Sequence, residues 1–217
     1  MKTILAIGYR SGVLLISLIS LFSLYDNELP WLETTSYFTT LIHLLTIAVL
    51  VNIIFISFFQ LSVNGFIYYM YQASIILLVL TMLVYTFILL PFLLTQDGTY
   101  PAFSFEDTMV HFGIPILMVA DYFLFVPKAF AKKWMIYVNL SLPLLYLVYV
   151  EIYARNGGVF TLGGAPSRVP YFFLNVDVVG VWNLGIIVVG LIVLIAFLGW
   201  IYYLIDQIVS VKLKHHY

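Results

Sequence analysis

The chain has 217 residues, of which 64% are hydrophobic and only 9% are charged, and its mean hydropathy is +1.09. Ordinary soluble domains carry about 25% charged residues, so this composition indicates an integral membrane protein. The formal net charge is −1 and there are no cysteines. Without a basic patch to neutralise phosphates, nucleic acid is not an expected partner, and the lack of cysteine excludes a disulfide framework.

Long apolar runs recur along the chain. A bilayer core about 30 Å thick needs about 20 apolar residues in a helix, and only helices or closed barrels satisfy the backbone hydrogen bonds there. The sequence therefore predicts an all-α integral membrane protein, a six-transmembrane-helix bundle that forms a single transmembrane domain over residues 1–217. The predicted spans cover about residues 3–24, 37–59, 70–94, 108–126, 134–153 and 178–204. The segment 154–177 is predicted to be a long loop.

Lysines concentrate on one side of the predicted bundle. With six spans, the lysines that fall on this side are Lys2, Lys128, Lys132, Lys133, Lys212 and Lys214. Loops on the cytoplasmic side of a membrane carry an excess of lysine and arginine. The sequence therefore predicts that the N-terminus and the C-terminus are both cytoplasmic.

Polar residues near the outer ends of several spans are expected to share one layer. At a rise of 1.5 Å per residue, such positions lie within about 10 Å of the outer end of their helix. Ionisable groups at membrane depth are costly and by default mark a functional site. The residues expected to line or support a pocket at this level are Thr39, His43, Glu151, Tyr171 and Asn175.

Three further residues of this layer have the chemical types of a nucleophile, a base and an orienting acid: Thr40, His111 and Asp107. Asp107 and His111 are four residues apart, which places the carboxylate one helical turn from the imidazole. A carboxylate bonded to one ring nitrogen fixes the tautomer and leaves the other nitrogen free to activate a hydroxyl. Pro115 removes the backbone hydrogen bond to the carbonyl of His111 and is expected to loosen the helix there.

Arg10 and Asp121 are predicted to lie nearer the cytoplasmic side. Both fall about 10 Å from the cytoplasmic ends of their spans. Unpaired charges at that depth are costly, so we expect a structural ion pair between them.

Three blocks resemble the six-span family of androgen-induced membrane proteins, and more closely its prokaryotic branch. The blocks are SYFTTLIHLL (residues 36–45), HFGIPILMVADYFLF (residues 111–125) and VPYFFLNV (residues 169–176). Animal members of the family hydrolyse fatty acid esters of hydroxy fatty acids with a threonine near the outer end of span two and a histidine near the start of span four. The resemblance implies that His111 is this histidine, that Asp121 is its acidic companion, and that the protein lies in a prokaryotic cell membrane.

The resemblance leaves the threonine open and is incomplete in two places. A Phe-x-Thr spacing selects Thr40, which we favour, whereas the Tyr-Phe-Thr pattern of the prokaryotic branch selects Thr39. Asp107 stands where the family has asparagine, and Asn175 stands where the third block has an acid. The hydrolase activity belongs to the animal proteins, and its transfer to the prokaryotic branch is an analogy.

No cofactor or metal ion is expected. Two histidines could bind haem, but His43 and His111 both lie near one surface. A catalytic zinc site needs three protein ligands, of which the third would have to be Asp107 or Glu151, and no spacing indicates such a site.

The sequence therefore supports one main functional hypothesis, an intramembrane hydrolase of lipid esters with a threonine nucleophile and a histidine base in an outer-leaflet pocket. The expected partner is a membrane lipid or lipid-like substrate. The alternative is a non-catalytic lipid or small-molecule binder, or a transporter, although no inverted repeat or pair of broken helices indicates transport. The substrate and the oligomeric state stay open.

Overall fold

The computed structural model describes residues 2–24, 31–95, 102–162 and 165–214. Among these residues, six helical segments are long and apolar enough to cross a membrane, which confirms the predicted number of apolar helices. The segments are Lys2–Ser23, Phe38–Phe58, Gly65–Leu93, Phe105–Phe125, Lys133–Arg155 and Val181–Ser210.

The first four segments form one side of the bundle. They comprise α1 (Lys2–Ser23), α3 (Phe38–Phe58), α4 (Gly65–Val84) with η1 (Tyr85–Leu89) and α5 (Leu90–Leu93), and α6 (Phe105–Thr108) with η2 (Met109–Gly113) and α7 (Ile114–Phe125). The short helix α2 (Trp31–Thr34) precedes α3. Helices α1, α3, α4 and α7 pack against one another.

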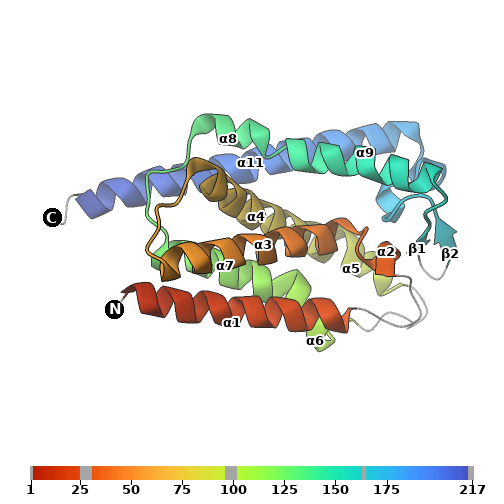
Figure 1. The fold of residues 1–217 in the computed structure, drawn as a ribbon. Helices are drawn as coiled ribbons and strands as arrows, with labels where there is room; N and C mark the ends of the chain where they lie inside the picture. The colour runs from red at the N-terminus through yellow and green to blue at the C-terminus, as the bar shows by residue number, and fades with distance from the viewer. Residues whose placement is uncertain (1, 25–30, 96–101, 163–164, 215–217) are drawn as a thin grey trace.

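The remaining elements form the other side. They are α8 (Lys133–Val138), α9 (Ser141–Arg155), the antiparallel strands β1 (Phe160–Leu162) and β2 (Ala165–Ser167), η3 (Phe172–Leu174), α10 (Val176–Val179) and α11 (Val181–Lys214). Helix α11 contacts α4 and α8. The start of α1 and the end of α11 lie at the same end of the bundle, here called the terminal end, whereas α2 and the hairpin lie at the opposite end (Figure 1).

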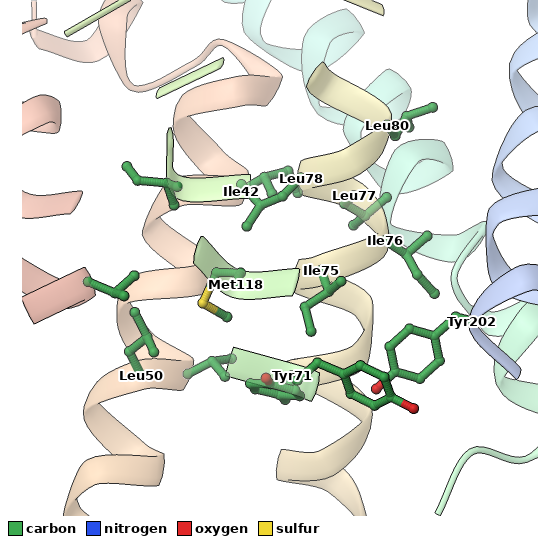
Figure 2. Packing of buried hydrophobic residues seen from close by; sticks show 14 of the residues in the cluster. Ile42, Leu50, Tyr71, Ile75, Ile76, Leu77, Leu78, Leu80, Met118 and Tyr202 are labelled. Atoms are coloured by element: carbon green, nitrogen blue, oxygen red, sulfur yellow. The ribbon is translucent and has the colours of Figure 1, made fainter. Parts of the chain in front are cut away.

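The core is built around α4, which is the most buried helix of the bundle. Leu77 and Leu78 of this helix are fully buried, and they belong to one core cluster with Met118 of α7 and Leu50 of α3 (Figure 2). In contrast, α11 exposes most of its apolar side chains, including Trp182. Lipid tails are as apolar as these side chains, so an exposed apolar face of this kind is compatible with an integral membrane protein.

Several element boundaries differ from the prediction. The third segment begins at Gly65, not near residue 70, because Asn64 Oδ1 accepts a hydrogen bond of 2.8 Å from the Ile67 N–H and caps the helix. The fifth is broken between α8 and α9, where Pro143 removes the N–H that would bond the carbonyl of Asn139. The sixth continues to Lys214, beyond the apolar run that predicted its end near residue 204.

The predicted loop 154–177 contains regular structure. It includes the β1–β2 hairpin, in which Phe160 pairs with Ser167, and η3. Phe160 is fully buried and packs with Tyr37 and Tyr153. This segment therefore covers the end of α3 with aromatic side chains, and aromatic pairs of this kind stabilise by about 0.5–1.5 kcal/mol each beyond their buried area.

Candidate functional site

Two π-helical turns lie side by side in the half of the bundle away from the termini. In η1 the Leu90 N–H bonds the carbonyl of Tyr85, and in η2 the Ile114 N–H bonds the carbonyl of Met109. In both cases the donor directly precedes a proline, Pro91 or Pro115. A proline ring clashes with the carbonyl four residues earlier and offers no N–H, so the widened turns follow from the two prolines. Such π turns occur frequently at functional sites.

The two turns bring Tyr85 and His111 into face-to-face contact. Their ring centroids are 3.6 Å apart and the planes are inclined by 5°. Phe112 meets the edge of the same tyrosine ring at 5.7 Å. The stacking fixes the plane of the His111 imidazole, so the ring nitrogens point in set directions within the bundle.

Asp107 anchors this pair from the preceding turn. Its carboxylate accepts the Tyr85 hydroxyl, at 2.8 Å to Oδ1 and 2.7 Å to Oδ2, and the Phe103 N–H at 2.9 Å. Its own N–H bonds the Ser104 hydroxyl, which caps α6. Oδ1 lies 3.8 Å from His111 Nε2, an electrostatic contact longer than a hydrogen bond. A carboxylate can only accept, so its position favours a proton on Nε2 and leaves the lone pair of His111 on Nδ1.

His43 is a second buried imidazole at the same level. Its Nδ1 lies 2.8 Å from the carbonyl oxygen of Thr39, and because a carbonyl can only accept, Nδ1 must carry the proton. The lone pair therefore resides on Nε2, which has no hydrogen-bond partner among the described residues. The Val110 carbonyl and the His111 ring both lie close enough to interact electrostatically with His43. His111 Nδ1 likewise lacks a hydrogen-bond partner within the described part of the chain.

The two candidate threonines occupy different environments. Thr40 is buried on α3, one turn before His43 and on the same face. No hydrogen bond of its hydroxyl is present in the described ranges. Thr39 instead lines a cavity of about 100 Å³ between α3, α4, α9 and α11. The structure thus places Thr40 inside the bundle on the face of α3 that carries His43, and Thr39 on the side of the cavity.

The walls of this cavity, here called the apolar cavity, are formed mostly by aliphatic and aromatic side chains. Its polar groups are the hydroxyls of Thr39, Thr81, Tyr146 and Tyr171. Tyr171 comes from the segment that leads into η3, and its side chain interacts with Thr39 and Tyr146. Burial raises the pKa of Tyr171, so this phenol keeps its proton near neutral pH and can donate a hydrogen bond to an oxygen in the cavity.

Two residues expected in the pocket lie elsewhere. The Glu151 side chain is 62% exposed and pairs with Arg155, with 2.6 Å between Oε1 and Nε. Its position on α9 turns it away from α3, which depth alone could not indicate. Asn175 caps α10, because its Oδ1 accepts the Asp177 N–H at 3.0 Å.

Arg10 and Asp121 form a buried ion pair, with 2.9 Å between Nε and Oδ1. The Tyr71 hydroxyl donates to the other carboxylate oxygen at 2.6 Å. Tyr71 is fully buried and belongs to the core cluster (Figure 2). These contacts join α1, α4 and α7. They give each oxygen of the Asp121 carboxylate a partner, without which its burial would be costly.

Sequence reasoning missed two residues of these networks. Tyr85 belongs to the predicted third span, where nothing distinguished it from the other aromatic residues of the chain. Asp206 is fully buried in α11 and accepts hydrogen bonds from the Tyr122 hydroxyl at 2.9 Å and the Ala131 N–H at 3.0 Å. A carboxylate in an otherwise apolar helix was a detectable signal, but the sixth span was predicted to end before it.

Among the described residues, no group of three or more His, Asp or Glu side chains is arranged to hold a metal ion. The site is therefore a cluster of two imidazoles, a carboxylate and a phenol, with the Thr40 hydroxyl one turn from His43. Comparison of the chain with models of protein families, with characterised proteins and with solved structures finds no match.

Proposed function

We propose that the protein is an intramembrane hydrolase of lipid esters, with Thr40 as nucleophile, His111 as general base and Asp107 as the group that orients His111. The observation that carries this proposal is the state of His111. Its ring is held by Tyr85, its Nε2 faces Asp107, and its Nδ1 has no hydrogen-bond partner in the described structure. A mostly buried imidazole with one oriented and one free nitrogen has the features of a general base.

The proposed reaction has two steps. His111 Nδ1 takes the proton of the Thr40 hydroxyl while the oxygen attacks the ester carbonyl, and the resulting imidazolium gives this proton to the departing alcohol. Water then attacks the acyl-threonine, His111 accepts a proton from that water, and the proton returns to Thr40 as the fatty acid leaves. A hydrogen-bond donor near the carbonyl would stabilise the oxyanion of both steps.

In this proposal the apolar cavity holds the acyl chain of the substrate beside α3. It is lined by Thr39, which precedes Thr40 on α3, and by Tyr171, whose phenol can donate a hydrogen bond. The cavity also borders α9 and α11, whose outer faces carry exposed apolar side chains such as Leu144 and Ile192. This supports lateral entry of an acyl chain from the bilayer.

Family membership and orientation belong to the same proposal. The three short blocks of residues 36–45, 111–125 and 169–176 support a place in the prokaryotic branch of the androgen-induced six-span proteins. The lysines at the terminal end, among them Lys128 and Lys132, support a cytoplasmic location of both termini. The site would then lie in the outer leaflet of a prokaryotic cell membrane.

The test is ester hydrolysis by the full chain reconstituted in liposomes, with a long-chain fluorogenic acyl ester and with a fatty acid ester of a hydroxy fatty acid. Thr40→Ala and His111→Ala should each lower the rate by about 10²-fold or more, the range for loss of acid–base catalysis. Thr46→Ala is the matched control, because Thr46 is also buried on α3 and, among the described residues, its hydroxyl bonds only the Ile42 carbonyl, at 2.8 Å. Full activity in both site variants would refute the proposal.

A second candidate function is lipid binding without catalysis. The lining of the apolar cavity favours this alternative. Thr39 and Tyr171 contribute hydroxyl groups to it, whereas Thr40, His43 and His111 do not line it. A cavity with a few hydroxyls and apolar walls suits retention of an ester-bearing lipid. Binding of a non-hydrolysable ether lipid by wild type, with no ester turnover by the same preparation, would select this alternative.

A further inference from the structure

A second, larger cavity lies at the terminal end of the bundle, and His111 is not among the described residues that line it. It has a volume of about 1110 Å³ and lies between α1, the α3–α4 connection, the end of α7 and the start of α8. We call it the basic cavity. Neither the proposed reaction nor the apolar cavity uses any residue that lines it.

The charges that line the basic cavity have one sign. Four cationic side chains contribute to its wall, Lys2, Arg10, Lys128 and Lys132, and no Asp or Glu is among the described residues that line it. The carboxylates nearest to these cations, Asp121 and Asp206, are fully buried behind the wall in α7 and α11. Lys2 and Lys132 form no ion pair with any described residue. The cavity thus keeps positive charge that an anion could neutralise.

Arg10 is the most constrained of the four cations. Its side chain is nearly buried, and Asp121 engages only its Nε, at 2.9 Å. No hydrogen bond of either terminal nitrogen is present among the described residues, which leaves both Nη groups as donors beside the cavity. Because the Tyr71 hydroxyl holds the second oxygen of Asp121 at 2.6 Å, the guanidinium is fixed in one orientation. A pre-oriented guanidinium suits bidentate recognition of a phosphate.

Lys128 lies at the rim where α7 ends. Its ammonium donates to the carbonyls of Tyr122 and Val126 and lies 3.9 Å from the centre of the Tyr122 ring. Burial lowers the pKa of Lys128, and the nearby carboxylates of Asp206 and Asp121 act in the opposite direction. With two of its three N–H groups used, the ammonium retains one donor for a ligand.

The rest of the wall is apolar and aromatic. Phe123, Leu124, Phe130 and Trp134 line the cavity, and each of these side chains is at least half exposed. Tyr and Trp are enriched where the hydrocarbon core of a membrane meets the headgroups. A ligand that matched this wall would combine an anionic head with a hydrocarbon tail.

We propose that the basic cavity binds the phosphate headgroup of an anionic membrane lipid, with Arg10, Lys128 and Lys132 on the phosphate and the acyl chains against Phe123 and Leu124. Basic pockets between transmembrane helices bind lipid headgroups in this manner. The site is independent of the proposed hydrolase: it requires no chemistry, and its ligand is retained, not consumed.

The test is native mass spectrometry of the detergent-solubilised full chain, titrated with dioleoyl phosphatidic acid, with dioleoyl phosphatidylcholine and with inorganic phosphate. The phosphatidic acid should bind about tenfold or more tightly than the zwitterionic lipid. The double variant Lys128→Gln/Lys132→Gln should weaken its binding by about 10-fold to 100-fold, the range for loss of charge-assisted hydrogen bonds. Lys133→Gln is the matched control, since Lys133 is exposed beside Lys132 but does not line the cavity.

A second variant tests Arg10 without leaving the Asp121 carboxylate buried and unpaired. Arg10→Met combined with Asp121→Asn removes both charges together and should abolish the preference for phosphatidic acid while the protein still unfolds cooperatively. Equal binding of the two lipids by wild type, or equal loss in the Lys133→Gln control and the Lys128/Lys132 variant, would overturn the proposal. Inorganic phosphate bound as tightly as phosphatidic acid would overturn the assignment of a lipid.

Discussion

Replacement of Tyr85 by Phe isolates one hydroxyl in the candidate site. The substitution keeps the ring that stacks on His111 at 3.6 Å and deletes only the group that donates to Asp107 at 2.7 and 2.8 Å. One hydroxyl proton makes one bond, shared between the two carboxylate oxygens. A hydrogen bond to a buried charged group contributes about 1.5–3 kcal/mol, whereas one between neutral groups contributes about 1 kcal/mol. For a chain of this size such a loss lowers Tm by about 3–12 °C.

The assay is thermal unfolding in a neutral detergent, with Tyr9→Phe as the matched control. Tyr9 also spans two helices, but its hydroxyl donates to a neutral carbonyl, that of Leu117, at 2.8 Å. Tyr85→Phe should therefore lower Tm by more than Tyr9→Phe does. Equal shifts, or no shift for Tyr85→Phe, would contradict a stabilising hydrogen bond from the Tyr85 hydroxyl to the Asp107 carboxylate.

Four features outside the candidate site can be tested by substitution. Arg10→Met or Asp121→Asn alone should destabilise by about 3–5 kcal/mol because each strands a buried partner, and chemical denaturation should show a much smaller loss when the two are combined. Gly180, between α10 and α11, has φ 77° and ψ 157°, so Gly180→Ala should lower the free energy of unfolding by about 1–3 kcal/mol. Gly185 is at a helical position with open space around it, so Gly185→Ala should not destabilise the protein in the same unfolding assay. Asp206→Asn should cost about 1–3 kcal/mol, since a neutral amide replaces the acceptor of Tyr122 and Ala131; an unchanged Tm would contradict this role. Burial, and after it the charge of Glu33, raises the pKa of Tyr37 above its ordinary 10.0. Above pH 10 the unfolded state therefore releases a proton that the folded state keeps, and the free energy of unfolding falls as pH rises. Tyr37→Phe should reduce that fall in urea titrations.

The number of apolar helices could be predicted from the sequence because hydrocarbon length sets the length of a span. Whether a proline breaks its helix or only widens it could not be predicted. Pro143 separates α8 from α9, but Pro91 and Pro115 only widen their helices into π turns. Which of these outcomes a proline produces depends on the neighbouring helices that satisfy the freed backbone groups.

Part of the candidate site could also be anticipated. The four-residue spacing of Asp107 and His111 depends only on helical geometry, and the structure places their side chains 3.8 Å apart. Likewise, equal depth anticipated that Arg10 could meet Asp121. The contribution of Tyr85 could not be anticipated, because it depends on the rotation of one π turn against another, and depth says nothing about the direction in which Glu151 points.

Covalent labelling shows whether Thr40 is an activated nucleophile. The full chain in liposomes is treated with a long-chain fluorophosphonate, and the modified residue is located by peptide mass mapping. We expect one adduct on Thr40, absent in Thr40→Ala, strongly reduced in His111→Ala and unchanged in Thr46→Ala. An adduct on another residue, or labelling that persists in Thr40→Ala, would contradict it.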